Sequence, residues 1–300
     1  MTISIAAWNV NSVKARIVHM LDWLKQDAPD IALLQETKCV DDAFPKMEIE
    51  DLGYNLALFG EKTYNGVAIL SKFPLEDIRR GLPGDSGDAQ ARYIEAVVSL
   101  PRVTGAGCRV SDKKGIPSVT PQALRVASVY VPNGQDAASE KFQYKLRFLD
   151  RLRAHMQTLL AYDEMLVIGG DYNIAPENAD VHDPKAWEGS VLTHEEVRRR
   201  FRGILHLGMY DAGVVPGAGC RVSDKKAVSS PAPLYTWWDY RNNAFARDDG
   251  LRIDHLLLSS QAADALSGWR VEKKLRGLDK ASDHAPVVII LRERSEAQDL

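Results

Sequence analysis

The sequence is poor in cysteine, has no long apolar run and carries no excess of positive charge. Its three cysteines, Cys39, Cys108 and Cys220, are too few for a disulfide framework and lack the close spacing of a zinc site. No apolar run approaches the roughly 18 residues that a membrane span needs, and no signal-peptide pattern opens the chain. We therefore expect a soluble protein of the reducing cytoplasm.

The charge balance excludes a further class of protein. The 300 residues include 38 Lys and Arg against 41 Asp and Glu, which gives a net charge of −3. Such a chain is not a generally basic nucleic-acid coat. Any contact with nucleic acid must therefore depend on a local patch or on a metal ion.

What the sequence does contain is enough apolar residues for a large core. Hydrophobic residues make up 45% of the chain, and short apolar runs bounded by turn residues predict strands. We expect strands over residues 2–8, 31–34, 67–70, 92–100, 124–131, 165–168, 235–240, 253–258 and 287–291. Helical spacing of apolar residues predicts helices over residues 14–26, 139–160 and 195–204. No linker divides the chain, which favours one α/β domain over residues 1–300 with a polar, frayed tail at 292–300.

The stretch MLVIGGDYNIAP, residues 165–176, combines a buried strand with a polar end. The apolar run stops at Gly169 and Gly170, and Asp171 and Asn173 follow. Residues two apart in an extended chain point to the same side, so Asp171 and Asn173 could face one reacting group. A carboxylate can take a proton from water, and an amide can donate to an oxyanion. An Asx-rich turn after a core strand is the alternative that this stretch leaves open.

Other predicted strands also end in polar residues. The set comprises Asn9, Glu36, Tyr130, Asn133, Asp171, Asn173, Asp254, Asp283 and His284. Carboxylates, amides and a single histidine suit a hard cation such as Mg²⁺, and the lack of a cysteine in the set makes zinc less suitable. Such a site fits metal-assisted attack of water on a phosphate.

One decapeptide, GAGCRVSDKK, occurs twice, at residues 105–114 and 217–226. The two copies are too far apart for a solenoid repeat. We interpret them as passive loop insertions near residues 103–120 and 215–230, because lengthening a loop changes its closure entropy little. The alternative is a basic rim in which the lysines of both copies contact DNA phosphates.

Eight short motifs run through the chain in a fixed order. They are WNVNS (8–12), LQETK (34–38), NGVAILS (65–71), YVPNG (130–134), GGDYNIAP (169–176), TWWDYR (236–241), GLRIDHLLLS (250–259) and SDHAP (282–286). Together they resemble the exonuclease III family of apurinic/apyrimidinic endonucleases, within the endonuclease/exonuclease/phosphatase superfamily. WNVNS, GDYN and SDHAP point to the superfamily, whereas LQETK, TWWDYR and GLRIDHLLLS point to its DNA-repair branch.

The resemblance implies a fold and a metal. The fold would be a four-layer sandwich of two mixed β-sheets packed face to face and flanked by helices, with the matched strand ends meeting at one edge. The metal would be Mg²⁺, with Mn²⁺ as a substitute, and Glu36 would be its chief ligand. The residues implied at or near the metal are Asn9, Glu36, Asp171, Asn173, Asp283 and His284.

The resemblance also implies catalytic roles. Asp171 would activate the attacking water or protonate the leaving oxygen, and Asn173 would steady that water. His284 would contact the phosphate while Asp254 orients its ring, because an imidazole needs a carboxylate partner to fix its tautomer. Tyr130 would hydrogen-bond the phosphate or assist Asp171.

The residues implied in substrate binding are Asn11, Asn133, Trp237, Trp238 and Leu251. The two tryptophans and the leucine match an apolar pocket that receives a flipped-out abasic sugar, which is small and costs little to unstack. Outside that motif, a tryptophan pair in a strand is more typical of core packing. Lys141 matches a family lysine near the DNA backbone, whereas residues 198–200 are more typical of a solvated helix face.

The leading functional hypothesis is a Mg²⁺-dependent DNA-repair phosphodiesterase. It would cut 5′ to abasic sites in duplex DNA and would also have 3′→5′ exonuclease and 3′-phosphatase activity. The expected partner is double-stranded DNA with abasic sites or blocked 3′ ends, bound by a cytoplasmic monomer that works at the nucleoid and does not bind membranes. The alternatives are a superfamily phosphodiesterase for lipid or inositol phosphates and a non-catalytic DNA-binding module.

Overall fold

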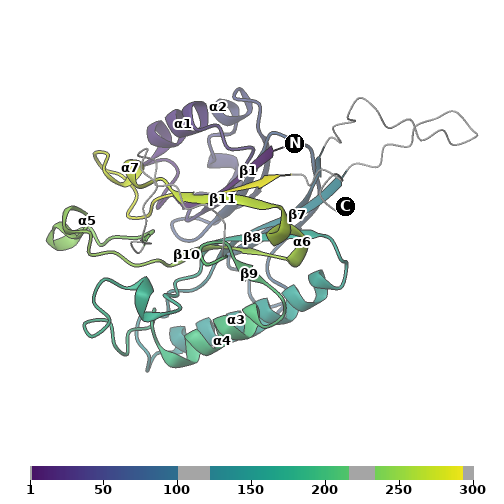
Figure 1. Cartoon of the computed structure of the whole chain (residues 1–300). Helices are drawn as coiled ribbons and strands as arrows, with labels where there is room; N and C mark the ends of the chain where they lie inside the picture. The colour runs from purple at the N-terminus through teal and green to yellow at the C-terminus, as the bar shows by residue number, and fades with distance from the viewer. Residues whose placement is uncertain (1, 101–121, 216–233, 293–300) are drawn as a thin grey trace, which may run out of the picture.

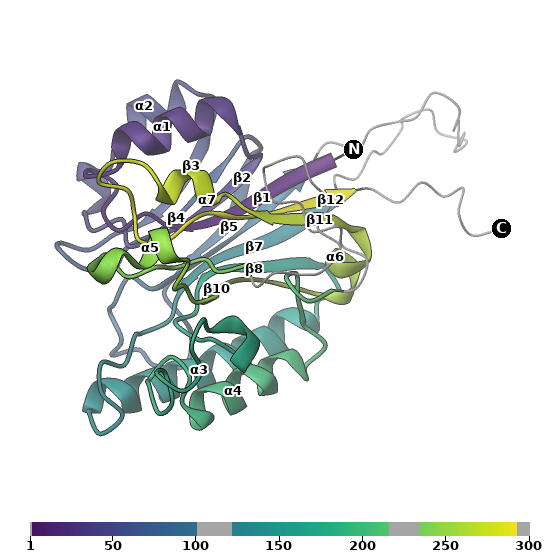
Figure 2. The same cartoon turned by 60° about the vertical axis from the view of Figure 1, so that its left-hand side comes forward.

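The computed structural model describes residues 2–100, 122–215 and 234–292. Two six-stranded β-sheets pack face to face, and helices cover both outer faces (Figures 1 and 2). The expected four-layer sandwich is confirmed. Both copies of the repeated decapeptide, most of the predicted insertions and most of the tail lie outside the described residues.

The first sheet, called sheet A here, has the strand order β11-β12-β1-β2-β4-β3. Its strands are β1 (Thr2–Asn9), β2 (Ile31–Gln35), β3 (Asn55–Phe59), β4 (Val67–Ser71), β11 (Leu266–Val271) and β12 (Val287–Arg292). The second, sheet B, has the order β5-β6-β7-β8-β10-β9. Its strands are β5 (Leu75–Arg80), β6 (Tyr93–Leu100), β7 (Gln122–Tyr130), β8 (Met165–Asp171), β9 (Tyr210–Asp211) and β10 (Asp254–Leu258).

Two pairs of helices form the outer layers. Helices α1 (Ile17–Gln26) and α2 (Lys46–Glu50) cover sheet A, and α3 (Glu140–Leu160) and α4 (Glu195–Leu205) cover sheet B (Figure 1). The short helices are η1 (Asp41–Ala43), η2 (Asn178–Asp180), η3 (Arg241–Asn243), α5 (Ala244–Arg247), α6 (Ser260–Ala265) and α7 (Lys273–Arg276). Helix α3 begins where the Ser139 side chain accepts a hydrogen bond from the backbone N–H of Phe142.

The alternation of side chains along each strand divides the core into layers. In β1, Ile3, Ile5 and Ala7 belong to the cluster between the sheets, whereas Ala6 and Trp8 pack against α1. The sheets approach closely at Gly169 of sheet B, where an added Cβ would lie 2.9 Å from the Leu33 side chain of sheet A. A buried core of this kind fixes the register, because a slip of one residue would turn each apolar row outward.

The inner rows of both sheets become polar at the same end. Asn9 pairs with Gln35 in sheet A, and Asp171 pairs with both Tyr130 and Asp254 in sheet B. These residues continue the inward-facing rows of their strands, so their side chains cap one open end of the core between the sheets. Strand register therefore brings together residues that are far apart in the sequence.

One predicted strand is wrong. Residues 235–240 form only isolated bridges, in which Trp237 pairs with Leu251 and His284. The chain then turns away, because the Asp239 side chain accepts from the backbone N–H of Arg241 and Asn242 is left-handed at φ +58°. Among the described residues, no helix has the length and apolarity to cross a membrane.

Candidate active site

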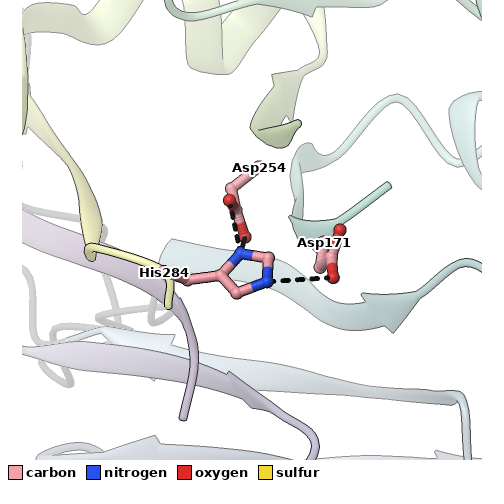
Figure 3. A group of neighbouring side chains, drawn as sticks. All are labelled: Asp171, Asp254 and His284. Atoms are coloured by element: carbon pink, nitrogen blue, oxygen red, sulfur yellow. Dashed lines mark hydrogen bonds and ion pairs between the residues drawn. The ribbon is translucent and has the colours of Figure 1, made fainter. Parts of the chain in front are cut away.

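His284 lies between two carboxylates at the polar end of the core (Figure 3). Its Nδ1 is 2.9 Å from Oδ2 of Asp254, and its Nε2 is 3.7 Å from Oδ2 of Asp171. Thr236 donates to Asp254 Oδ2 at 2.6 Å and thereby fixes that carboxylate. All four side chains are buried, so the imidazole is held in one orientation with a carboxylate facing each nitrogen.

The pKa values of Asp171 and His284 are both raised, but the shift favours the neutral form of Asp171 and the charged form of His284. Burial raises the pKa of Asp171 to about 7, and the charges of Asp254 and Glu36 add to the rise against the opposing charge of His284. Burial alone would lower the pKa of His284, but Asp254 and Asp171 raise it to about 10. At neutral pH, His284 is thus a cation, and Asp171 is poised to give up or take a proton.

Asn9 of sheet A links Glu36 to Asp171 of sheet B. Its Nδ2 donates to Glu36 Oε1 at 2.8 Å and to Asp171 Oδ2 at 2.9 Å. The second oxygen of Glu36 lies 2.8 Å from Nζ of Lys38, which also donates to Asn11 Oδ1 at 2.6 Å. Burial raises the pKa of Glu36, but the Lys38 charge and the Asn9 hydrogen bond outweigh it, so that pKa lies below its ordinary value.

Asn173 is fixed at each of its polar groups. Its backbone N–H donates to Asp171 Oδ1 at 2.8 Å, and its Nδ2 donates to the Val131 carbonyl at 3.0 Å and to Asp171 Oδ2 at 3.3 Å. Its Oδ1 accepts from Asn133 Nδ2 at 3.0 Å, and its backbone carbonyl accepts from Nζ of Lys145 at 2.7 Å. Asp171 and Asn173 therefore lie side by side, although Asn173 is left-handed at φ +51° and is not part of an extended chain.

Asp283 lies at the side of the site next to an aromatic residue. Its Oδ1 accepts from Asn11 Nδ2 and its Oδ2 accepts from Trp237 Nε1, each at 2.9 Å. Burial would raise the pKa of Asp283, but His284 and these two donors lower it. Asp283 is thus held in the ionised form by its surroundings.

Tyr130 borders a cavity beside the carboxylates. Burial, followed by the charges of Glu36 and Asp171, raises the pKa of Tyr130 well above its ordinary value, so the phenol keeps its proton. The Arg92 guanidinium lies 4.7 Å from the centre of its ring. The cavity has a volume of about 440 Å³, and Glu36, Asn133 and Lys141 also line it.

The donor set fits a hard divalent cation. The side chains of Glu36, Asp171 and Asp283 supply three carboxylates that the amides of Asn9 and Asn11 hold at the site, and carboxylate oxygens are the ligands that a hard cation prefers. Asp171, Asp254 and His284 also each place one possible ligand atom within 4.8 Å of the other two. Both ring nitrogens of His284 face carboxylates in this structure, so a cation that bound the imidazole would displace its contact with Asp254 or with Asp171.

Two of the other residues predicted at the metal are engaged otherwise in this structure. Asn9 turns its NH₂ group toward the carboxylates while its Oδ1 accepts from the Asn11 backbone N–H at 3.0 Å, so a 180° rotation of the amide is needed for it to bind metal through oxygen. Asn173 uses Oδ1 to bind Asn133. Glu36 is therefore the predicted metal ligand that these contacts favour most.

The structure separates the two tryptophans predicted to line the sugar pocket. Trp237 is partly exposed beside Asp283. Trp238 is 1% exposed, donates to Asp248 and packs against Phe245 at the other side of the segment. The placement of Trp238 in a substrate pocket was wrong, because adjacent residues of an extended segment point in opposite directions. Leu251 is also fully buried. It pairs with Trp237 through a backbone bridge and has no exposed surface for a substrate to contact.

Sequence reasoning missed three residues that contribute to the site. Thr236 was inside a recognised motif but was given no role. Trp187 lies edge-to-face with Trp237, with ring centres 6.0 Å apart, and nothing in the sequence pointed to that contact. Lys145 lies on the apolar face of α3 beside Phe142 and Leu149. A lysine on the predicted apolar face of a helix indicates a buried amine with polar partners, so the sequence did contain a signal for Lys145.

Comparison with known proteins shows which family the chain belongs to. Residues 6–284 match the family described as the endonuclease/exonuclease/phosphatase family. The chain is 30% identical over 288 residues to exodeoxyribonuclease III of Haemophilus influenzae, covering 94% of this chain and 97% of the relative. It is 28% identical over 292 residues to the DNA repair nuclease APEX1 of Danio rerio, covering 96% and 81%.

Solved structures give the same result. The 3′ phosphatase NExo from Neisseria, bound to a product DNA hairpin, is similar with a TM-score of 0.82 and 34% identity, covering 97% of this chain and 100% of that one. An AP endonuclease from Archaeoglobus fulgidus has a TM-score of 0.80 and 33% identity, covering 96% and 99%. The chain is an exodeoxyribonuclease III-like hydrolase and belongs to the endonuclease/exonuclease/phosphatase family.

Proposed function

We propose that the protein is a Mg²⁺-dependent DNA-repair nuclease that hydrolyses the phosphodiester bond 5′ to an abasic site in duplex DNA. The same site would remove nucleotides and phosphates from 3′ ends. The observation that carries the proposal is the row of Tyr130, Asp171 and Asp254 across three paired strands, with His284 between the two carboxylates. This arrangement suits attack of water on a phosphate that carries negative charge.

In the proposed mechanism, Asp171 accepts the proton of the attacking water. A pKa near 7 suits that task, because a general base works best when its pKa is close to the working pH. Asn173 holds Asp171 through two hydrogen bonds and places its amide beside the reacting phosphate. Cationic His284, fixed by Asp254, stabilises the charge on the phosphate oxygens, and protonated Tyr130 donates a hydrogen bond to them.

We propose that Glu36 is the main ligand of the metal, with Asp283 and Asn9 beside it. When bound, a divalent cation supplies charge neutralisation at the phosphate and lowers the pKa of water. In this structure Glu36 forms an ion pair with Lys38. A cation bound by Glu36 would compete with Lys38 for that carboxylate, and the partly exposed Lys38 ammonium would then be available to a phosphate.

We propose that Trp237 and Trp187 form the aromatic wall that accepts the abasic sugar. A wall of this kind selects a base-free sugar because an intact nucleotide is larger and costs more to unstack. The cavity beside Glu36, with Arg92 and Lys141 in its lining, would accommodate the adjoining DNA strand through its phosphates. We also propose that the whole chain acts as one unit and as a monomer on cellular DNA.

A gel assay on duplex DNA with one abasic analogue tests the proposal. We expect cleavage 5′ to the analogue with Mg²⁺ and none with EDTA. The same duplex without the analogue is the matched substrate, and an inositol phosphate tests the competing activity within the family. Hydrolysis of the inositol phosphate without cleavage of the DNA would overturn the proposal.

The aromatic wall has a separate test. Trp237→Ala should reduce the preference for abasic over intact DNA by more than it reduces 3′-phosphatase activity, because a phosphate end makes no use of a sugar pocket. Trp238→Ala is the matched variant on the buried side and should lower stability without changing the ratio of the two activities. A parallel loss of both activities in Trp237→Ala would point to general damage at the site.

A further inference from the structure

Lys145 is a buried amine that reaches the candidate active site from behind. Burial lowers the pKa of Lys145 to about 7, but its three carbonyl partners need three N–H donors and therefore favour the protonated form. Its side chain has no exposed surface, although it belongs to the second turn of α3. Nζ donates to three backbone carbonyls, those of Asn133 at 3.0 Å, Asn173 at 2.7 Å and Val191 at 2.8 Å. Among the described residues it forms no ion pair, so these carbonyl groups are what compensates its loss of hydration.

The three carbonyls belong to three separate loops. Asn133 follows β7, Asn173 follows β8 and Val191 precedes α4. A protonated amine has three N–H bonds that diverge from one atom, so one side chain can hold three segments at fixed separation. A neutral side chain of similar length cannot do this, because Met offers no donor and Gln offers two.

Two of these loops carry the amides of the site. The side chains of Asn133 and Asn173 are hydrogen-bonded to each other at 3.0 Å, and Asn173 is left-handed at φ +51°. A left-handed residue needs surrounding contacts to hold it. Lys145 binds the carbonyl of Asn173 while the N–H of that residue binds Asp171, so the two bonds together set the orientation of the residue.

We propose that Lys145 is a positioning residue of the nuclease reaction, which acts through Asn173 on the general base Asp171. The inference rests on the proposed function for the role of Asp171. Direct contact of Lys145 with DNA is excluded by its complete burial. Its effect must therefore appear in the rate of the chemical step and not in the affinity for DNA.

The main test is Lys145→Met, which keeps the length of the side chain and removes all three donors. We expect kcat to fall by about 10- to 100-fold, the scale on which outer partners of site residues act, while KM and DNA affinity stay close to those of the wild type. Lys145→Gln should give an intermediate kcat. If Lys145→Met does not fold, Lys145→Gln serves the same comparisons.

A matched control separates positioning from loss of stability. Leu152 is fully buried on the same apolar face of α3, two turns further along, and Leu152→Ala should destabilise the protein without changing kcat of the folded molecules. Circular dichroism gives the folded fraction for each variant. If Lys145→Met and Leu152→Ala have the same kcat per folded molecule, the proposal fails.

A double-mutant cycle tests whether Lys145 acts through Asn173. In an Asn173→Ala background, Lys145→Met should cause little further loss, since the side chain it positions is gone. If the double variant instead loses kcat by the product of the two single-variant factors, the two residues act independently and the proposal fails. Each protein is assayed both on the abasic duplex and on a 3′-phosphate end. The wild-type rate on the abasic duplex tests the proposed function, and the variant-to-wild-type ratio on either substrate tests Lys145.

Discussion

Two buried ionic clusters lie on opposite faces of strand β10 and behave differently. Asp254 faces the space between the sheets, where His284 is its partner. The next residue, His255, faces α4, where Asp211 and Arg252 are its partners. Each cluster contains two aspartates and a histidine, but only the second contains an arginine.

The arginine decides the difference between the clusters. Arg252 lies 2.7 Å from Asp180 and 2.7 Å from Asp211. Burial would raise the pKa of Asp211, but Arg252 and His255 hold that pKa far below its ordinary value. In the active-site cluster, burial and neighbouring carboxylates raise the pKa of Asp171 instead. The Arg252 cluster is balanced and structural. The active-site cluster has unbalanced negative charge, which suits proton transfer and a bound cation.

The largest expected contrast is between two isosteric changes. Asp171→Asn removes the proposed base, so kcat should fall by about 10²–10⁴-fold while abasic DNA still binds. Asp211→Asn makes the same chemical change in the balanced cluster and should leave kcat of the folded protein near the wild-type value. Single-turnover rates and DNA affinity check both. Equal losses of rate and affinity in Asp171→Asn would assign that residue a structural role.

The second contrast concerns stability. Arg252→Met leaves Asp180 and Asp211 buried without their partner, and breaking a buried ion pair in this way costs about 3–5 kcal/mol. Urea unfolding measures the loss, and we expect normal kcat for the molecules that remain folded. A loss of stability no larger than that for an exposed ion pair would mean that the cluster is open to water.

The third contrast compares how much Mg²⁺ binding stabilises variants of the two clusters. Mg²⁺ at about 100 times its Kd should stabilise the wild-type protein by about 2.7 kcal/mol, because binding to the folded state alone raises stability. Glu36→Gln should lose this effect, whereas Asp211→Asn should keep it. Thermal unfolding with Mg²⁺ or EDTA checks the prediction. An unchanged Mg²⁺ effect in Glu36→Gln would remove Glu36 from the metal site.

The smallest expected effect is a pH dependence of the balanced cluster. The pKa of Asp211 is lower in the folded protein than its ordinary value of 3.8, so its ion pairs contribute stability above that pH and lose it as pH falls further. The stability difference between the wild type and Asp211→Asn should therefore shrink below about pH 3.8. Asp22→Asn, a change of an exposed acid, is the control and should show no such trend. A difference that stays constant down to the acid transition would contradict the depressed pKa.

The sequence predicted the interior of both sheets and none of their edges. Each of the interior strands, such as β1 and β8, is an apolar run buried on both faces, and these runs were predicted within a few residues. The edge strands β3, β5, β9 and β11 were missed. Strand β5, with the sequence LEDIRR, is largely exposed, so its composition carries no strand signal and its pairing with β6 defines it.

The sequence by itself also determined which polar residues gather at the strand ends. Alternation along β1, β8 and β10 fixes Asn9, Asp171 and Asp254 on the inward rows once the apolar residues are buried. The motifs then identified the chemistry that these residue types support. None of this required knowledge of distances.

Only the tertiary structure decided how these residues are partnered. It placed His284 between two carboxylates, turned Trp238 away from Trp237 and brought Lys145 from α3 to three loop carbonyls. Local sequence cannot specify such contacts, because they join segments whose separation depends on how the two sheets and their helices pack. The charge balance that distinguishes Asp171 from Asp211 arises in the same way, since a pKa is set by burial and by neighbours in space.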